Sequence, residues 1–440
     1  MDSGNWLRRL LIILLFLPLL LLLFTPWGRT WGLTPILFLL LAVINFILLI
    51  WLFRRAAAAA QAQLPKPKMI HPDEQPDVIK EVMEVCVATH EDGIRIFRGP
   101  LRESPEQAFE KLKAAFPEDI VPLLQQDERL DTSIILMDKP IEQATLETPV
   151  RPALHWLLFF LTLLTTTWAG AMYQGIDLFQ EPARFTAGIP YAIGLLAILG
   201  CHEMGHYFAA KHHKMNVTPP YFIPVPFALG TFGAFIRMRT PPEERTSLFD
   251  MAIAGPLAGL VIALPALVLG LQTSEIVSRP IEAEGFIFSA LPANSFLFGL
   301  LARISFAGEL NPGDLVRLSP LGFAGWLGLL ITALNLVPVG QLDGGHIARA
   351  MFGTRTGLTI SRLAMWTIFL LALFVWPWLL LWALIIFMIA RRITPPLNDL
   401  TPVSGWRRGL GFFTFVILLM ILTPLPDAAW ARMSMHFPWF

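Results

Sequence analysis

The sequence predicts an all-α polytopic membrane protein that carries a small α+β domain between two groups of helices. Hydrophobic residues make up 55% of the 440 residues and charged residues only 15%, which is too apolar for an ordinary soluble protein. Apolar runs recur along the chain, and one bilayer crossing needs about 20 apolar residues. A longer polar stretch with strand and helix signals, residues 54–149, interrupts these runs. The net charge is zero without a long basic run, so nucleic-acid binding is not expected.

The predicted membrane core has about eight or nine transmembrane helices, according to how residues 359–390 fold. Trp376-Pro377-Trp378 divides this stretch, which is either a tight hairpin of two short helices or one long kinked helix. We favour the hairpin, because the positive charges then fall on one side of the membrane. The candidate spans are residues 10–27, 31–53, 153–173, 188–211, 250–272, 318–339, 359–375, 377–390 and 409–424.

The positive charges also predict the orientation. Arg8, Arg9, Arg54 and Arg55 flank the first two runs, and further Lys and Arg residues follow the fourth, sixth and eighth runs. All of them lie on one face if the N-terminus is cytoplasmic. Neither a small-residue cleavage site nor a Ser/Arg-rich transit segment is present, so residues 1–53 are expected to form an uncleaved helical hairpin. We therefore expect an integral protein of a prokaryotic cell (inner) membrane.

Residues 54–149 are expected to comprise a linker and a small α+β cytoplasmic domain. β-Rich runs predict strands, a Gly turn joins two of them, and Ser104 followed by Pro105 is typical of a helix start. The expected elements are strands at Glu84–Thr89, Ile94–Arg98 and Thr132–Met137, a turn at Asp92-Gly93, and a helix from Ser104 to Phe116. This segment has no recognisable catalytic motif, so we expect a structural or regulatory role. The membrane core is expected at residues 150–426, followed by a C-terminal tail, residues 427–440.

The strongest chemical signal is the pentapeptide His202-Glu203-Met204-Gly205-His206, near the cytoplasmic end of the run at 188–211. Positions i and i+4 of a helix share a face, so both imidazoles can bind one metal ion. Glu203 is offset by about 100° from His202 and can reach a water on that ion without being a ligand. With 9 histidines in 440 residues, a chance match somewhere in the chain is about a one-in-a-hundred event. Ionisable residues inside spanning segments are costly and usually functional, which favours the metal interpretation.

A catalytic zinc site needs a third protein ligand, because such sites use three protein ligands and one water. Asp343 is the best candidate from position alone, since it follows the sixth apolar run and lies on the same predicted membrane face as His206. Pro338 and Gly340 interrupt that helix and could turn Asp343 inward. An ordinary loop aspartate before a Gly-Gly turn remains the alternative.

Together, the two motifs resemble the site-2 protease family of intramembrane metalloproteases. The resemblance rests on His-Glu-x-x-His in one spanning helix and Asn-x-x-Pro-x-x-x-Leu-Asp-Gly, beginning at Asn335, at the end of a later one. It implies one Zn²⁺ ion held by His202, His206 and Asp343, with Glu203 as catalytic base. It further implies that Asn335 hydrogen-bonds to the substrate or to the developing oxyanion.

Softer features extend the resemblance over residues 156–426. The sequence from Ala254 to Gly259 is similar to a glycine-proline element of the family. Gly230, Thr231, Phe232 and Gly233 resemble its membrane-associated β-hairpin, which implies a substrate-binding strand edge. An ordinary glycine turn is the alternative.

Two differences from the usual sequence of the family indicate the branch that this chain resembles. Gly340-Gln341 stands where many members have Pro-Pro, which resembles the cyanobacterial and plastid yellow-green-type members. The loop at 273–317 is too short for the PDZ domain that many bacterial members carry. Substrate control by a PDZ domain is therefore not expected here, and residues 64–149 are a candidate for that role.

We expect a zinc-dependent intramembrane endopeptidase that hydrolyses peptide bonds of membrane-spanning substrates. Its expected partners are such membrane proteins and the lipid bilayer. One rival is another class of membrane protease with the same first motif, in which a glutamate is the third ligand. Others are a metal transporter, which should show inverted repeats and a path of ionisable residues, and an inactive scaffold, which should lack the base.

Overall fold

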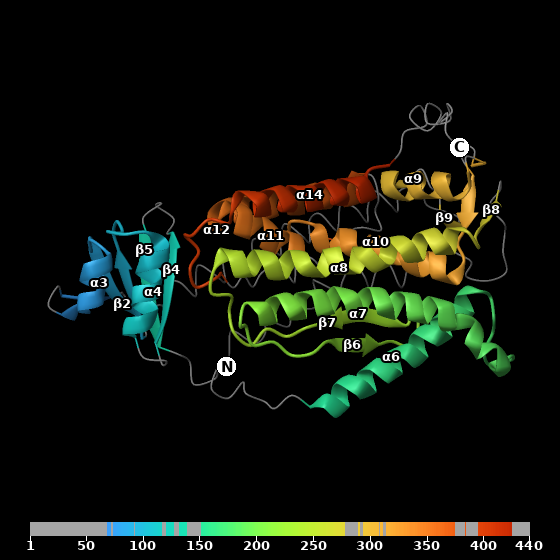
Figure 1. The fold of residues 1–440 in the computed structure, drawn as a ribbon, viewed down its shortest axis with the longest axis horizontal. Coiled ribbons are helices and arrows are strands. Elements are labelled where there is room, and N and C mark those ends of the chain that lie inside the picture. Colours follow the sequence, from blue (N-terminus) through green and yellow to red (C-terminus); the bar gives the residue numbers. More distant parts are fainter. Residues whose placement is uncertain are drawn as a thin grey trace, which may run out of the picture.

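The computed structural model describes residues 68–138, 151–374, 383 and 395–424, apart from gaps at 72–73, 92, 117–119, 127–131, 278–288, 291–293, 308 and 311–313. It shows a bundle of long helices with an α+β domain at one end (Figure 1). The helices run roughly along the long axis of the molecule, and the α+β domain lies beyond the ends of α8, α11 and α14 (Figure 1).

Helices α7 (Ile189–His212), α8 (Arg245–Leu271) and α10 (Pro320–Leu336) form the centre of the bundle. The most extensive packing is between α7 and α8, and α10 packs against both. Small residues permit this approach: a Cβ atom on Gly205 of α7 would lie 2.4 Å from the carbonyl oxygen of Ala254 in α8. Lipid tails are as apolar as the helices, so helix association in membranes depends on such close contacts.

The remaining helices surround this centre. Helix α6 (Pro152–Tyr173) packs against α7, and α14 (Gly405–Leu422) packs against α10. The short helix α11 (Asp343–Phe352) contacts α8 and leads into α12 (Thr354–Phe374). In Figure 1, α6 crosses below the central layer and α14 lies above it.

Five helices in the described part of the chain are long and apolar enough to cross a membrane, which makes this an integral membrane protein by its architecture. The five helices are Pro152–Tyr173, Pro182–His212, Arg245–Leu271, Thr354–Leu373 and Gly405–Leu422. They confirm the runs predicted at 153–173, 188–211, 250–272, 359–375 and 409–424. The run predicted at 318–339 forms α10, which ends at Leu336 after 17 residues. The runs at 10–27, 31–53 and 377–390 lie outside the described residues. The total of eight or nine spans and the hairpin at 359–390 therefore stay predictions.

The loop at 273–317 has secondary structure that the sequence analysis did not predict. Three short strands, β8 (Glu275–Val277), β9 (Ser289–Ala290) and β10 (Leu315–Arg317), form a sheet in the order β8-β10-β9. Helix α9 (Phe296–Ser305) begins at Ser295, whose side chain accepts a hydrogen bond from the Phe298 N–H. Strands of two or three residues show no alternation that a sequence pattern could reveal.

A β-hairpin is present where glycines suggested one. Strands β6 (Tyr221–Pro224) and β7 (Thr231–Phe235) pair antiparallel and lie against α6 and α7. Gly230 takes a left-handed conformation with φ of 79°, and the Thr165 hydroxyl donates a hydrogen bond of 2.7 Å to its carbonyl oxygen. The Tyr191 hydroxyl donates to the neighbouring Leu229 carbonyl at 3.0 Å. The hairpin is thus anchored to both helices at its turn.

The α+β domain contains a five-stranded sheet in the order β1-β2-β3-β5-β4 with two helices. Its elements are β1 (Lys68–Met69), α3 (Asp77–Val82), β2 (Val87–Glu91), β3 (Ile94–Arg98), α4 (Pro105–Ala115), β4 (Ile120–Gln126) and β5 (Thr132–Asp138). Strand β3, helix α4 and strand β5 confirm the predicted elements within one residue, and Ser104 is the N-cap of α4. The strand predicted at Glu84–Thr89 begins three residues later. Strands β1 and β4 and helix α3 were not predicted, and Asp92 lies outside the described residues.

An ion-pair cluster joins three helices at the end of the bundle near the α+β domain. The Arg407 guanidinium of α14 makes two hydrogen bonds to the Asp250 carboxylate of α8, at 2.7 and 2.8 Å. His213, at the end of α7, places its Nε2 atom 2.9 Å from the same carboxylate. Two parallel bonds from a planar guanidinium fix orientation as well as distance. This cluster therefore sets how α14 meets the central helices.

Replacing Arg407 with Ala should destabilise the helix bundle, because Asp250 would keep its charge in a partly buried place without its bidentate partner. We expect a loss of about 1–2 kcal/mol in unfolding free energy. Thermal unfolding of the detergent-solubilised protein measures the change. Arg408→Ala at the adjacent, exposed position is the matched control and should leave the midpoint unchanged; equal midpoints for both variants and the wild type would refute the role of the cluster.

Candidate metal centre

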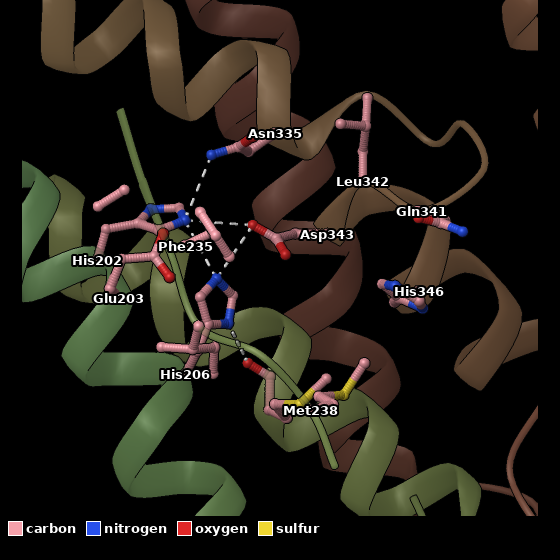
Figure 2. Close-up of a pocket in the computed structure, with 13 residues that line it drawn as sticks. His202, Glu203, His206, Phe235, Met238, Asn335, Gln341, Leu342, Asp343 and His346 are labelled. Carbon is pink, nitrogen blue, oxygen red and sulfur yellow. Dashed lines mark hydrogen bonds and ion pairs between the residues drawn. The ribbon is translucent and has the colours of Figure 1, made fainter. Parts of the chain in front are cut away.

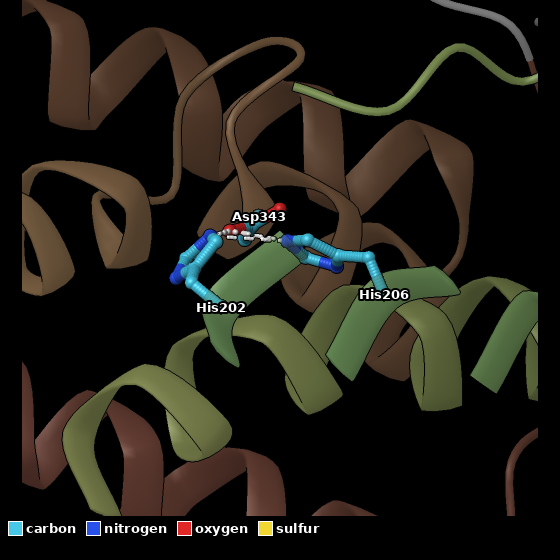
Figure 3. A group of neighbouring side chains, drawn as sticks. All are labelled: His202, His206 and Asp343. Carbon is cyan, nitrogen blue, oxygen red and sulfur yellow. Dashed lines mark hydrogen bonds and ion pairs between the residues drawn. The ribbon is translucent and has the colours of Figure 1, made fainter. Parts of the chain in front are cut away.

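The first two candidate ligands are placed by the geometry of α7. His202 and His206 lie one turn apart on the same face of the helix, and both are buried, with 4% and 8% of their surface exposed. Their Nε2 atoms are 3.1 Å apart. Both rings point away from the axis of α7 toward α11 (Figure 3). The i, i+4 spacing of the motif therefore produces the paired imidazoles that it predicts.

The third candidate ligand, Asp343, is brought to the histidines by the break after α10. The helix ends at Leu336, Gly340 takes a left-handed conformation with φ of 53°, and α11 begins at Asp343 itself. The chain packs tightly at this turn, since a Cβ atom on Gly344 would lie 1.9 Å from the Leu336 carbonyl oxygen. Asp343 is therefore held at the first residue of α11 and faces α7, as Figure 3 shows.

The three side chains fit a single tetrahedral metal ion. The Oδ2 atom of Asp343 lies 3.4 Å from Nε2 of His202 and 3.4 Å from Nε2 of His206. Ligand atoms at the usual zinc distances from a tetrahedral centre lie roughly 3.3–3.4 Å from one another. Two imidazole nitrogens and one carboxylate oxygen also form a donor set that catalytic zinc sites use. The residues present thus fit the metal that the sequence implied.

The imidazoles are oriented by contacts to α8. The Nδ1–H of His206 donates a hydrogen bond of 2.8 Å to the Met251 carbonyl, which leaves Nε2 free for a metal ion. Gly255 faces the same ring, and a Cβ atom there would lie 2.1 Å from His206 Nε2. Gly259 lies beside His202, where a Cβ atom would be 3.2 Å from the His202 Cβ. The glycines of α8 therefore create the space in which both rings lie.

The ligands open onto a pocket of about 250 Å³. Glu203 lines it beside both histidines, and Asn335 lines it above His202 in the view of Figure 2. Glu203 is buried, with 7% of its surface exposed, and Ile236 lines the pocket with it. Nδ2 of Asn335 lies 3.3 Å from Nε2 of His202. The pocket thus combines the three candidate ligands with a carboxylate and an amide donor.

The β-hairpin contributes to the pocket through residues other than those predicted. Ala234, Phe235, Ile236 and Met238 line the pocket, whereas Gly230, Thr231, Phe232 and Gly233 do not. Gly230 forms the turn, and the Thr231 hydroxyl donates to the Ile223 carbonyl across the hairpin. The glycine pattern located the hairpin, but the end of β7 is what reaches the metal centre.

Two further pocket residues, Gln341 and His346, were not assigned a role by sequence reasoning. Burial lowers the pKa of His346 to about 4, and the charge of Arg349 acts in the same direction, so its imidazole is neutral at pH 7. Burial raises the pKa of Asp343, but His206 and His202 outweigh this effect and hold that pKa well below its usual range. Helix α11, which supplies Asp343, therefore also supplies a neutral imidazole one turn further on.

Comparison with known proteins agrees with this centre. Residues 190–375, which contain all three candidate ligands with Glu203 and Asn335, match Peptidase family M50. No solved structure matches the chain.

Several curated plant proteins resemble the chain over a longer stretch. It is 34% identical over 244 residues to probable zinc metalloprotease EGY1, chloroplastic, of Arabidopsis thaliana, an alignment that covers 55% of this chain and 44% of that protein. It is 28% identical over 347 residues to probable zinc metalloprotease EGY2, chloroplastic, of Oryza sativa subsp. indica, covering 77% and 62%. For probable zinc metallopeptidase EGY3, chloroplastic, of Arabidopsis thaliana, the identity is 26% over 370 residues, covering 78% and 64%. The chain thus spans less than two thirds of each of these relatives. The names of these relatives as zinc metalloproteases, together with the His-His-Asp group of this chain, identify the metal as Zn²⁺.

Replacing Gly255 with Ala should remove zinc without altering any ligand, because the new methyl group would occupy the position of the His206 ring. We expect zinc affinity to fall by about 10- to 100-fold. Metal content of the purified protein and competition with a chromophoric chelator measure the loss. Gly409→Ala, at a helical glycine with no atom within 4 Å of the added Cβ, is the matched control; equal zinc affinity in both variants would contradict the proposed crowding.

Proposed function

The chain carries a peptidase family M50 domain and belongs to the plastid yellow-green-type branch of the site-2 proteases, and from this premise we propose that it is a zinc-dependent intramembrane endopeptidase. Its substrates are membrane proteins with a transmembrane segment, which it hydrolyses at peptide bonds within or beside the bilayer. The observation that carries this proposal is the convergence of two imidazoles, Asp343 and Glu203 on one pocket inside a helix bundle.

The roles follow from the position of each side chain. A bound zinc ion supplies a Lewis acid that polarises a peptide carbonyl and makes water more acidic. Glu203 lines the same pocket beside the histidines and is the group that accepts the proton of the attacking water and returns it to the leaving amine. Asn335 directs its amide toward the position of His202 Nε2, where it can donate a hydrogen bond to a developing oxyanion.

The hairpin is a suitable receptor for the substrate backbone. A peptide bond inside a helix has its carbonyl occupied by a hydrogen bond, so a helical substrate must unwind before hydrolysis. An extended segment can then add to the edge of a strand through main-chain hydrogen bonds. Strand β7 ends in the pocket at Phe235, Ile236 follows it there, and the exposed aromatic side chain of Phe232 lies along the strand. We propose that this strand presents the unwound substrate to Glu203.

The orientation of the centre is also part of the proposal. His206 lies six residues before the end of α7 at His212, a distance of about 9 Å along a helix. That end of the bundle is where the α+β domain packs (Figure 1). The excess of Lys and Arg on this side supports a cytoplasmic location for the α+β domain and for the mouth of the metal centre, if the protein resides in a prokaryotic cell membrane. The names of the curated relatives refer to chloroplasts.

The rival functions account less well for these features. A class with a glutamate as third ligand would not need Asp343 at 3.4 Å from both histidines. An inactive scaffold would not need a buried carboxylate such as Glu203 beside the candidate ligands. A metal transporter would need a path of ionisable groups through the membrane in addition to a binding site. Proteolysis gives a role to Glu203 and Asn335 as well as to the three candidate ligands.

Substituting Glu203 with Gln should abolish cleavage while zinc stays bound, because the amide keeps the shape of the side chain but cannot accept the proton. We expect cleavage to fall by roughly 10²–10⁴-fold. The assay incubates purified protein with a panel of single-span membrane proteins and measures both product and bound zinc. Asn335→Ala provides a second variant that should retain zinc and cleave more slowly. Equal cleavage by wild type and Glu203→Gln would rule out this mechanism.

Replacing Gly233 with Ala tests the role of the hairpin. Gly233 has φ of 98°, and a Cβ atom there meets no atom within 4 Å, so the change strains the backbone without causing a clash. We expect kcat/KM to fall about 5- to 10-fold with zinc content unchanged, because the strained backbone costs about 1 kcal/mol or more. Gly405→Ala is the control at a glycine without contacts. A wild-type kcat/KM for Gly233→Ala would exclude the hairpin as the substrate receptor.

A further inference from the structure

A short segment between α12 and α14, residues 397–401, joins the α+β domain to the membrane core. On one side, Leu124 of β4 donates its N–H to the Leu397 carbonyl at 2.7 Å and accepts from the Asp399 N–H at 2.9 Å. On the other side, the N–H groups of Leu397 and Asn398 donate to the carbonyls of residues 242 and 243, at 3.0 and 2.7 Å. We call residues 397–401 the strap. It extends the sheet beyond β4 up to the start of α8.

The strap is rigid and buried. Asn398 is fully buried, and its side chain accepts from the backbone N–H groups of Leu400 and Thr401 and donates to the Thr401 hydroxyl. Leu397 and Leu400 pack against the apolar core of the α+β domain. A segment with hydrogen bonds on both edges and its side chains in a core moves together with that domain.

Asp399 of the strap faces two buried arginines of the membrane core. Asp399 is 6% exposed, and Arg245 and Arg349 are 7% and 2% exposed. Oδ2 of Asp399 accepts a hydrogen bond from the Thr354 N–H at the start of α12, and its charge acts on both arginines. Buried charges are tolerated when they compensate one another, and removing one partner is strongly unfavourable. The charge of Asp399 therefore offsets part of the cost of burying these two guanidinium groups, while its hydrogen bond to Thr354 attaches the strap to the start of α12.

The arginines in turn hold the helix that carries Asp343. Arg245 donates from Nε to the Ala350 carbonyl in α11 at 2.8 Å. Arg349, itself in α11, directs Nη2 to the Gly340 carbonyl, just before the helix, at 3.4 Å. The segment from Gly340 to Ala350 is thus hydrogen-bonded at its start to Arg349 and at its end to Arg245, and the negative charge of Asp399 acts on both arginines. Asp343 lies between these two attachments.

We propose that Asp399 is a positioning residue for the metal centre and that the strap couples the α+β domain to the placement of Asp343. Through Arg245 and Arg349, the strap fixes α11, and α11 fixes the carboxylate that meets the two histidines. Coupling between two sites is reciprocal, so zinc should stabilise the docking of the domain as much as the docked domain stabilises zinc binding. This inference concerns metal binding and does not depend on proteolysis.

The first test measures zinc affinity of the full-length protein in detergent by competition with a chromophoric chelator. Asp399→Asn keeps the size of the side chain and an acceptor for Thr354 but removes the charge that faces the arginines. We expect zinc affinity to fall roughly 2- to 30-fold, the range typical of mutations that act through a network. Asp177→Asn, at an exposed site in the loop after α6, is the matched control and should bind zinc like the wild type. Wild-type affinity in Asp399→Asn would overturn the proposal.

The second test uses amide hydrogen exchange to detect the reciprocal effect. Removing zinc from the wild type should accelerate exchange in peptides covering residues 120–126 and 397–401, as well as in α11. The same treatment should change the first two regions much less in Asp399→Asn. His206→Ala, which lacks a ligand, controls for effects of the chelator itself. Acceleration confined to α7 and α11 in the wild type would also overturn the proposal, even if Asp399→Asn fails to fold.

Discussion

Two imidazoles and a carboxylate within 3.4 Å of one another, enclosed by apolar helices, form a group that one cation can occupy, and the rest of the structure is built around this group. The central helices must approach closely enough to exclude lipid yet leave room for two rings, which the glycines of α8 permit. The chain must also break after α10 so that a residue distant in sequence can complete the group. Helix packing and metal binding are therefore satisfied by the same contacts.

The features that the sequence predicted well are those with a local physical origin. Long apolar runs predict spanning helices because the bilayer imposes a length, and His202 and His206 predict a shared ligand face because the helix has a fixed pitch. Asp343 was less certain from position alone, since its approach depends on how the turn at Gly340 packs. Ile236 and His346 had no motif to reveal them, because they reach the pocket only through the placement of β7 and α11. The short strands β8–β10 were missed for a similar reason, as their pairing is entirely tertiary.

The α+β domain gains significance from how it is attached. A tethered domain would need only a flexible linker, but this one shares backbone hydrogen bonds with the segment that precedes α14 and with the start of α8. A further ion pair between Lys113 and Glu243, at 2.8 Å, lies on the same boundary. The domain that the sequence left without a chemical role is thus in mechanical contact with the helices that carry the ligands. Because the loop at 273–317 is too short for a PDZ domain, this contact offers a different route by which a signal outside the bilayer could reach the metal centre.

If the substrate is a transmembrane helix, as we propose, the depth of His206 in α7 determines the lengths of the two fragments. About 9 Å from the helix end corresponds to roughly six residues of helical rise, whereas about 20 residues are needed to cross the hydrocarbon layer. Hydrolysis at this depth leaves two transmembrane fragments of unequal length. The longer one can remain embedded, but the shorter one is too brief to hold its polypeptide in lipid, so that portion would detach into the aqueous phase on the side of the α+β domain.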